Sequence, residues 1–450
     1  MAPHQNSTWF SRNGRALWLN GYPLVAIMVW MVILSLSPRH GTACYVYQAA
    51  HYALLPLCFG INILSRMIKS TEHPPVRLTW PDLSMVLYVV LVVVSVSVND
   101  DLPGGLGQYM IVIYRTIFVP FSAYWLVRSF RPGAKDLERL TQVMVTLCII
   151  EIIVGCAARF KPEILPNFWP GRVEQFGGFR ITGTFSQPDV YCAALIFFLT
   201  FIFQYAVVRG KALTRSLCLI LFNAGLIGIF LSYSRASWLS ALVFLSFLAF
   251  AYKRLFLLFV LPVLLLGGGL LGTIFTQELS SVARRIETLQ TVGNRVISGY
   301  AGTKMFLEKP VLGWGYGSYD LHDSSFIEQV GGFKPSEWDL KEGTSHNTFL
   351  TILAETGMVG LCLYAFTLGW WLLLTIKIWL RLPGSPSDGK FLDRRFLAML
   401  WANIVFIMAA GQFVDIRFFP FTLVQVWLIL GLIANMVDRY QHPSDTFLFR

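Results

Sequence analysis

DVYCAALIFFLTFIFQYAVV, residues 189–208, is the stretch that decides the fold. About 20 apolar residues are what a helix needs to cross ~30 Å of hydrocarbon. Blocks of similar length recur from Gly21 to Val437. Because backbone polar groups cannot stay unpaired in lipid, segments this long and continuous predict helices, and the alternating pattern of a membrane barrel is absent. We therefore expect an all-α, polytopic membrane bundle.

The apolar blocks predict about twelve transmembrane helices. Their expected positions are roughly 21–37, 45–65, 81–98, 108–128, 138–157, 189–208, 214–232, 236–252, 255–275, 357–380, 396–413 and 418–437. One long polar segment separates the ninth span from the tenth. We therefore divide the chain into helices 1–9 over 1–275, a large loop with amphipathic helices over 276–356, and helices 10–12 with a C-terminal tail over 357–450.

The composition agrees with this class. Of the 450 residues, 55% are hydrophobic and only 14% are charged, against about 25% charged in ordinary soluble domains. A net charge of +11 would suggest a nucleic-acid partner in a soluble protein. Here the basic residues lie mostly in short loops, so we expect no such partner; topology explains the charge first and an acidic substrate second. The cysteines lie mostly in apolar runs without metal spacing, which is typical of core residues.

The Lys/Arg bias of the short loops orients the helices, because cytoplasmic loops carry the excess of positive charge. With the N-terminus inside, the expected inward segments carry Arg12, Arg15, Arg66, Lys69, Arg77, Arg128, Arg131, Lys135, Arg139, Arg209, Lys211, Arg215, Lys253, Arg254, Lys377, Arg381, Lys390, Arg394 and Arg395. The outward loop at 99–107 has Asp100 and Asp101 but no Lys or Arg. The alternation predicts that both termini are cytoplasmic.

Two expected outward segments break this pattern with arginines, the connection 158–188 and the loop 276–356. Apolar residues of the loop recur at three- and four-residue steps, which predicts an amphipathic helix lying on the membrane or on the bundle. These residues are Leu279, Val282, Ile286, Leu289 and Ile297. Further along, GWGYG at 313–317 predicts a turn, since glycine permits unusual backbone conformations.

His346, at the end of this loop, is the leading catalytic candidate. An outward histidine with a near-neutral reference pKa suits a general base, worth roughly 10²–10⁴-fold in rate. Capping or packing at a helix start is the equal alternative. For Gly357 and Gly360 two interpretations stay open. On a continuous helix they lie below His346 and admit another helix or a lipid chain; alternatively, the chain breaks at Thr356-Gly357 between a loop helix and the span.

Arginines at the expected outward face form the second group of candidates. Arginine is always charged and grips phosphate through two parallel hydrogen bonds. Any one of them can equally be a snorkelling side chain or a headgroup contact. Several cations gathered where orientation disfavours them suggest an anionic substrate. The candidates are Arg235, Arg295, Arg180 and Arg417, together with Arg284 and Arg285, which fall off the apolar stripe of the loop helix.

Three acidic residues are less informative. Glu151 lies inside the fifth span, where an acid is a functional hypothesis by default, although pairing with another span is an equal alternative. Asp320 and Asp323 hint at a metal, but two acids three apart in a polar loop favour a solvated loop. The sequence contains no Walker loop, Rossmann glycine pattern or HExxH motif.

The pattern His346-Asn347, nine residues, Gly357-x-x-Gly360 resembles the signature of the O-antigen ligase family. The large loop before that span and the segments 180–188 and 232–238 resemble the family too, so the likeness covers most of the chain. One departure is Asp189, where many relatives carry Asn. The wider superfamily also contains O-antigen polymerases and protein O-oligosaccharyltransferases, which share the motif.

The resemblance implies a glycosyltransferase of the bacterial inner membrane with its site at the periplasmic face. It would transfer O-antigen glycan from undecaprenyl diphosphate to a sugar hydroxyl of lipid A-core, with inversion at C1. His346 would be the base, the arginines would stabilise the diphosphate without metal or cofactor, and Asn347, Gly357 and Gly360 would belong to the substrate site. From another class, a transporter of lipid-linked glycan is the alternative, but the polar residues gather at one face.

Overall fold

The computed structural model describes residues 9–37, 42–68, 78–99, 105–175, 178–208, 211–265, 290–335, 345–382 and 391–441. It is predominantly helical, as expected. The long helices are α1 (Trp9–Leu36), α2 (Thr42–Ile68), α3 (Trp80–Val98), α6 (Ala134–Phe160), α7 (Pro188–Val208), α8 (Ala212–Leu231), α9 (Arg235–Ala251), α13 (Gln290–Glu308), α16 (Thr348–Ile378), α17 (Arg394–Ala410) and α18 (Pro420–Gln441).

Shorter helical segments complete the chain. One continuous rod consists of α4 (Gly105–Ile113), the π-helical turn η1 (Tyr114–Phe118) and α5 (Val119–Phe130). The remaining short segments are η2 (Pro162–Ile164), α10 (Lys253–Leu255), η3 (Phe256–Val260), α14 (Tyr319–His322), η4 (Asp323–Ser325), η5 (Trp379–Arg381) and η7 (Ile416–Phe418).

The number of spans is lower than expected. Among the residues described, eight helices are long and apolar enough to cross a membrane, or nine if α9 and the helix after it, bent by 117°, form one span. Two further helices are not in that count: α1, of which the stretch Tyr22–Leu36 was assessed, and α17, which has 17 residues. The predicted ninth span extends beyond residue 265 and so lies partly outside the described residues. The protein is a multi-pass membrane protein, but the count of twelve is not confirmed.

The core of the bundle is built around α7 and α18, which are almost wholly buried by other helices. α7 packs on α8, α18 on α5, α17 on α9, and α16 on α3. Aromatic rings fill the centre: the ring of Phe421 lies within 5.3–6.4 Å of the rings of Trp30, Phe185, Phe197 and Phe198. By contrast, α2 and α3 leave many apolar side chains exposed, as expected for helices that face lipid.

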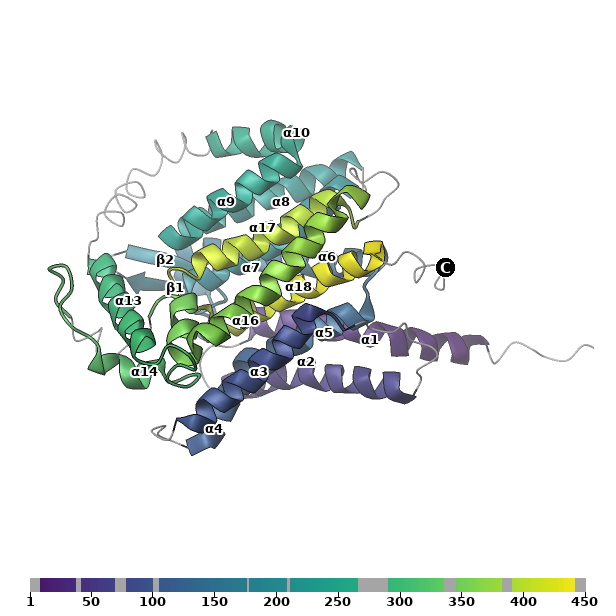
Figure 1. Ribbon diagram of the computed structural model, residues 1–450. Helices are drawn as coiled ribbons and strands as arrows, with labels where there is room; N and C mark the ends of the chain where they lie inside the picture. Colours follow the sequence, from purple (N-terminus) through teal and green to yellow (C-terminus); the bar gives the residue numbers. More distant parts are fainter. Residues whose placement is uncertain are drawn as a thin grey trace, which may run out of the picture.

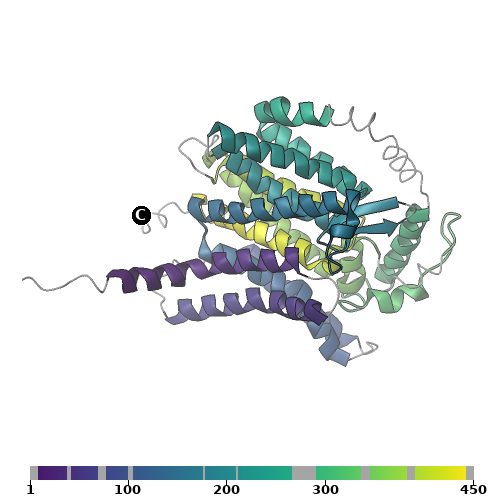
Figure 2. The same ribbon diagram turned by 180° about the vertical axis from the view of Figure 1, so that it is seen from behind.

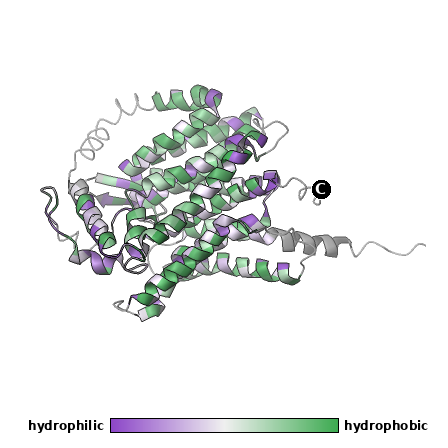
Figure 3. Cartoon of the chain, viewed as in Figure 1, coloured by the Kyte–Doolittle hydropathy of each residue, from purple (hydrophilic) through white to green (hydrophobic). Residues whose placement is uncertain are grey.

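Short polar elements gather at one end of the bundle, seen from both sides in Figures 1 and 2. We call it the hairpin end, because it carries a two-stranded hairpin together with α13 and α14. The start of α1 and the end of α18 lie at the opposite end. Figure 3 shows apolar colours along the long helices and more polar colours on α13 and α14. The hairpin end corresponds to the face that the Lys/Arg bias predicts to be periplasmic, and that orientation stays a prediction.

The hairpin itself was missed by the all-α expectation. It pairs β1 (Gly171–Gln175) antiparallel with β2 (Gly178–Gly183), and places Arg180 opposite Val173. At its open end Gly171 and Gly183 have φ of 63° and 59°, a region that glycine enters without a Cβ clash. Strands of five and six residues carry too little alternation to stand out beside 20-residue apolar blocks, so only the structure revealed them.

Candidate active site at the hairpin end

The hairpin presents Arg180 to the turn between α8 and α9. The Arg180 side chain is buried, and its Nε donates to the carbonyl oxygen of Ser232 at 3.3 Å. Its Nη2 lies 3.9 Å from Oδ2 of Asp189, the second residue of α7. One arginine therefore connects β2, the α8–α9 turn and the beginning of α7.

Asp189, which departs from the family pattern, organises the start of α9. Its Oδ1 accepts a hydrogen bond from the hydroxyl of Ser234 and another from the hydroxyl of Ser237 at 3.1 Å. Ser234 is the N-cap of α9 and accepts from the backbone N–H of Ser237 at 3.2 Å. Because Arg235 is the first residue of α9, this network holds its backbone beside Arg180.

Arg295 joins these two arginines from α13. It is half-buried, and its guanidinium lies over the ring of Phe413 at 5.6 Å. Burial lowers the pKa of Arg295; the negative charge of Asp189 opposes this, and the positive charges of Arg235 and Arg180 add to it. The structure thus brings three of the predicted arginines into one electrostatic neighbourhood. We call Arg180, Arg235 and Arg295 the arginine cluster.

The turn that carries His346 precedes α16. Asn347 caps this helix, since its Oδ1 accepts from the backbone N–H groups of Phe349 at 3.0 Å and Leu350 at 3.1 Å. The hydroxyl of Ser345 accepts from the N–H of Asn347 at 3.0 Å and lies 2.5 Å from the hydroxyl of Thr351. His346 is half-buried and has φ of 52°, a left-handed conformation uncommon outside glycine. Such strain in an over-determined turn is typical of functional positions.

The connection between α17 and α18 links this turn to the arginine cluster. The backbone N–H of Thr348 donates to the carbonyl oxygen of Gly411 at 2.8 Å, and Nδ2 of Asn347 donates to Oε1 of Gln412 at 3.3 Å. The next residue, Phe413, carries the guanidinium of Arg295 on its ring. His346 and Arg295 are therefore anchored on the same short connection.

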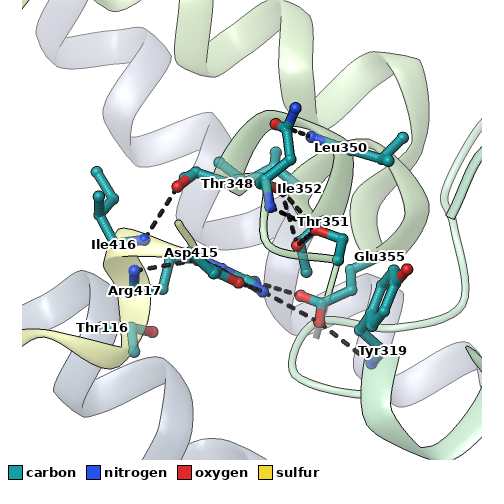
Figure 4. Close-up of polar contacts among 12 residues, drawn as sticks. Thr116, Tyr319, Thr348, Leu350, Thr351, Ile352, Glu355, Asp415, Ile416 and Arg417 are labelled. Atoms are coloured by element: carbon teal, nitrogen blue, oxygen red, sulfur yellow. Dashed lines mark hydrogen bonds and ion pairs between the residues drawn. The ribbon is translucent and has the colours of Figure 1, made fainter. Parts of the chain in front are cut away.

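Arg417, in the same connection, has a different environment. Its Nη1 lies 2.5 Å from Oε2 of Glu355, and its Nη2 lies 2.7 Å from Oδ2 of Asp415. Figure 4 shows the guanidinium between the two carboxylates, with Tyr319 donating its backbone N–H to Glu355. Burial alone would lower the pKa of Arg417, but the charges of Asp415 and Glu355 raise it well above the ordinary value. Arg417 is thus paired with carboxylates, not set among cations as Arg295 is.

Gly357 breaks α16, which decides between the two interpretations left open above. Its φ of 66° and ψ of −169° are non-helical, so the chain consists of a short helix and then the span. The break frees backbone groups that a continuous helix would pair, and the segment 310–315 satisfies them. Trp314 N–H donates to the carbonyl of Ala354, and Gly315 N–H donates to that of Glu355, both at 3.0 Å. In return, Met358 N–H donates to the carbonyl of Pro310 at 2.8 Å.

The glycines of the signature therefore serve close packing. A Cβ on Gly357 would lie 2.1 Å from the carbonyl oxygen of Val311, and one on Gly360 would lie 3.3 Å from Leu91 of α3. The predicted turn at 313–317 is confirmed, since Gly313, Gly315 and Gly317 all have positive φ. Together these glycines let the loop fold back on α16 and place Glu355 against Arg417.

The remaining candidates are placed as follows. Arg284 and Arg285 lie outside the described residues, as does most of the predicted loop helix, of which α13 is the described continuation. Glu151 accepts from the backbone N–H of Thr184 at 3.0 Å and from its hydroxyl at 2.5 Å, so it pairs with the turn after β2. Within the described ranges no group of three or more His, Cys, Asp or Glu side chains could hold a metal. Of the two acids that hinted at one, Asp323 is buried, and burial raises the pKa of its carboxyl group to about 6.

Comparison with known proteins gives one match. Residues 218–365 match the family model described as O-antigen ligase. This match covers less than half of the chain. The suspected resemblance is thereby confirmed, and the O-antigen ligase match includes Arg235, Arg295, His346, Gly357 and Gly360. No curated protein matched the chain.

Sequence reasoning missed two residues of this candidate site. Asp189 was noted only as a departure, because its serine partners lie 45 and 48 positions away in the chain. Glu355 was overlooked because the tenth span was expected to begin at residue 357, whereas the apolar helix begins at Thr348. Had the span been extended backwards, an acid within it would have marked a functional candidate.

Proposed function

We propose that the protein is an O-antigen ligase. It transfers O-antigen glycan from undecaprenyl diphosphate to a sugar hydroxyl of lipid A-core, at the periplasmic face of the bacterial inner membrane, with both termini in the cytoplasm. The observation that carries this proposal is the arginine cluster at the hairpin end of an apolar bundle, since two of its three members, Arg235 and Arg295, lie inside the matched O-antigen ligase region. A diphosphate on a lipid chain is an anion that reaches such a place from the membrane.

The arginine cluster stabilises the leaving group. As the bond between C1 of the first sugar and the phosphate oxygen breaks, negative charge grows on the diphosphate. Guanidinium groups already fixed by Ser232, Asp189 and Phe413 need little reorganisation to meet that charge. Removing one such donor commonly lowers the rate by about 10²–10³-fold.

His346 takes the proton. The acceptor hydroxyl attacks C1 as its proton passes to the imidazole, a new C1–O bond forms, and undecaprenyl diphosphate leaves from the opposite side. This direct displacement inverts the anomeric centre. The turn that holds His346 is fixed by the Asn347 cap and by the Ser345–Thr351 hydroxyl pair, which suits a base that must meet its substrate in one orientation.

Arg417 receives a positioning role. Its guanidinium is already neutralised by Glu355 and Asp415, so binding diphosphate would require breaking two buried ion pairs. It holds the α17–α18 connection against α16 and thereby fixes the surface on which His346 and Arg295 are anchored. Asn347 and the two signature glycines act in the same way, through backbone geometry.

The chemistry requires no metal, because fixed cations replace it at the diphosphate. Transfer by purified protein should therefore continue at an unchanged rate in EDTA. Loss of transfer in EDTA, restored by Mg²⁺, would contradict this part of the proposal.

Substitution of His346 tests the base. His346→Ala and His346→Gln should each lower transfer by roughly 10²–10⁴-fold, because a glutamine keeps polarity but cannot take the proton. Expression, thermal unfolding and binding of the glycan-loaded carrier should stay at the wild-type level. Near-normal lipopolysaccharide in either variant would remove His346 from the mechanism.

A deletion strain separates the ligase from its relatives. Ligase loss should leave long glycan on the carrier and bare core in the outer membrane. A ladder collapsed to one repeat would indicate a polymerase, and unglycosylated protein acceptors would indicate a protein O-oligosaccharyltransferase.

A further inference from the structure

A cavity of about 560 Å³ lies beside the site, between α2, the α4–η1 segment, α14 and η7. Its volume is in the range of small-molecule sites, roughly 300–1,000 Å³. Tyrosine rings provide much of its wall, among them Tyr52, Tyr109 and Tyr316. Glu355 and Arg417 lie at the same cavity, so the ion pair in Figure 4 is part of its wall.

The polar groups of this cavity differ in how far they are already engaged. Arg417, Glu355 and Asp415 are saturated by one another. Gln108 and Asp320 line the cavity, and neither side chain has a hydrogen bond or ion pair to another side chain in the part of the chain that the structure describes. Arg115 stacks over the ring of Tyr52 at 4.8 Å and forms no ion pair there either. These three exposed side chains can turn to a ligand.

The charges of the cavity balance closely. Arg115 and Arg417 stand against Asp320, Glu355 and Asp415. Such a wall disfavours a diphosphate, unlike the arginine cluster. It suits an uncharged ligand with many hydroxyl groups, since carboxylate and amide oxygens accept from hydroxyls while guanidinium and amide N–H groups donate to them. Flat tyrosine rings can pack against the C–H faces of sugar rings.

The position of the cavity relative to His346 identifies which sugar it holds. Thr351 lines the cavity, and its hydroxyl meets that of Ser345, next to His346. Arg295 approaches the same connection from Phe413. In a direct displacement the attacking hydroxyl and the leaving diphosphate lie on opposite sides of C1. None of the arginine cluster lines the cavity, so the sugar that it holds, on the side of the base, is the acceptor.

We propose that this cavity binds the acceptor oligosaccharide, with Gln108, Asp320 and Arg115 as its hydrogen-bonding groups. The inference rests on the proposed ligase function for its kinetic consequence. The binding itself can be measured without transfer, so the two can fail separately.

Steady-state kinetics with purified protein provide the first test. Gln108→Ala and Asp320→Asn should each raise the KM for lipid A-core about three- to tenfold, the usual effect of losing one hydrogen bond. The KM for the glycan-loaded carrier should not change. Gln329→Ala and Glu328→Gln are matched controls, because they remove the same chemical groups. Both residues are exposed a few positions after Asp320, and neither lines the cavity. Controls that raise the acceptor KM equally would overturn the proposal.

Direct binding provides the second test. Deacylated lipid A-core is equilibrated with the purified protein in the absence of donor, and its Kd should rise by the same factor in Gln108→Ala and Asp320→Asn. If these variants weaken binding of the glycan-loaded carrier instead, the cavity belongs to the donor and the inference is wrong. If neither ligand is affected, it is also wrong. If wild-type protein binds the core through these residues but never transfers glycan to it, the proposed function fails while the cavity assignment stands.

Discussion

Arg295 contacts the short connection between α17 and α18, and Arg417 belongs to that connection, yet their surroundings are opposite. Arg417 is enclosed by two carboxylates that raise its pKa in spite of burial. Arg295 stacks on Phe413, forms no ion pair with the described residues, and has a pKa lowered by burial and by Arg235 and Arg180.

The difference separates two uses of a buried cation. A guanidinium with its own carboxylates contributes to the fold, because removing it would leave those carboxylates buried and uncompensated. A guanidinium held near others of like charge is destabilised by their repulsion when no ligand is bound. Binding of an anion reduces that repulsion. Perturbed groups of the second kind cluster at functional sites. On this argument we propose that Arg295 takes part in the chemistry and that Arg417 stabilises the fold.

Arg417→Ala should have the largest effect on stability. The substitution leaves the carboxylates of Glu355 and Asp415 buried without their cation. Breaking a buried ion pair in this way lowers the free energy of unfolding by roughly 3–5 kcal/mol. Thermal unfolding of the purified protein in detergent measures the loss, with the exposed Arg381→Ala as control. Adding Glu355→Gln should recover part of it, because one buried charge is then removed. A melting curve equal to that of wild type would contradict the proposal that Arg417 stabilises the fold and Arg295 does not.

Arg295→Ala should show the reverse pattern. Transfer should fall by about 10²–10³-fold because a donor to the diphosphate is lost. The free energy of unfolding should change by about 1 kcal/mol or less, because a stacking contact is lost while like-charge repulsion is relieved. Arg295→Lys should lie between, since lysine keeps the charge without the two parallel hydrogen bonds. A destabilised but fully active Arg295→Ala protein would place this residue in the framework with Arg417.

Gly357→Ala should lower the free energy of unfolding by less than Arg417→Ala does, with no charged group removed from the site. Its backbone conformation is nearly restricted to glycine and costs another residue about 1–3 kcal/mol, and the added Cβ would meet the carbonyl of Val311. Gly369→Ala in the same helix is the matched control, because nothing lies within 4 Å of its Cβ position. That control should be neutral or more stable by about 0.5–1 kcal/mol. Equal unfolding temperatures for the two variants would show that the break is not needed to hold Glu355 against Arg417.

Much of the site could be predicted from residues close together in the chain. The glycine turn at 313–317 is local, so sequence spacing was enough to predict it; capping at the start of the next helix was considered for His346, whereas the cap is Asn347. The break at Gly357 could be named only as one of two alternatives, since its cause is the segment 310–315 that folds back on α16. The hairpin around Arg180 was missed, because its strands have only five and six residues.

The sequence by itself determined that this chain is a helical membrane protein with a region that resembles the O-antigen ligase family, because long apolar blocks and the His346–Gly360 pattern are properties of consecutive residues. Only the tertiary structure decided which arginines act together. Arg417 meets Glu355 across 62 positions of sequence, and Arg295 reaches the neighbourhood of Arg180 from another helix. Charge interactions depend on distance in space and on exclusion of water, and both arise only when the helices pack.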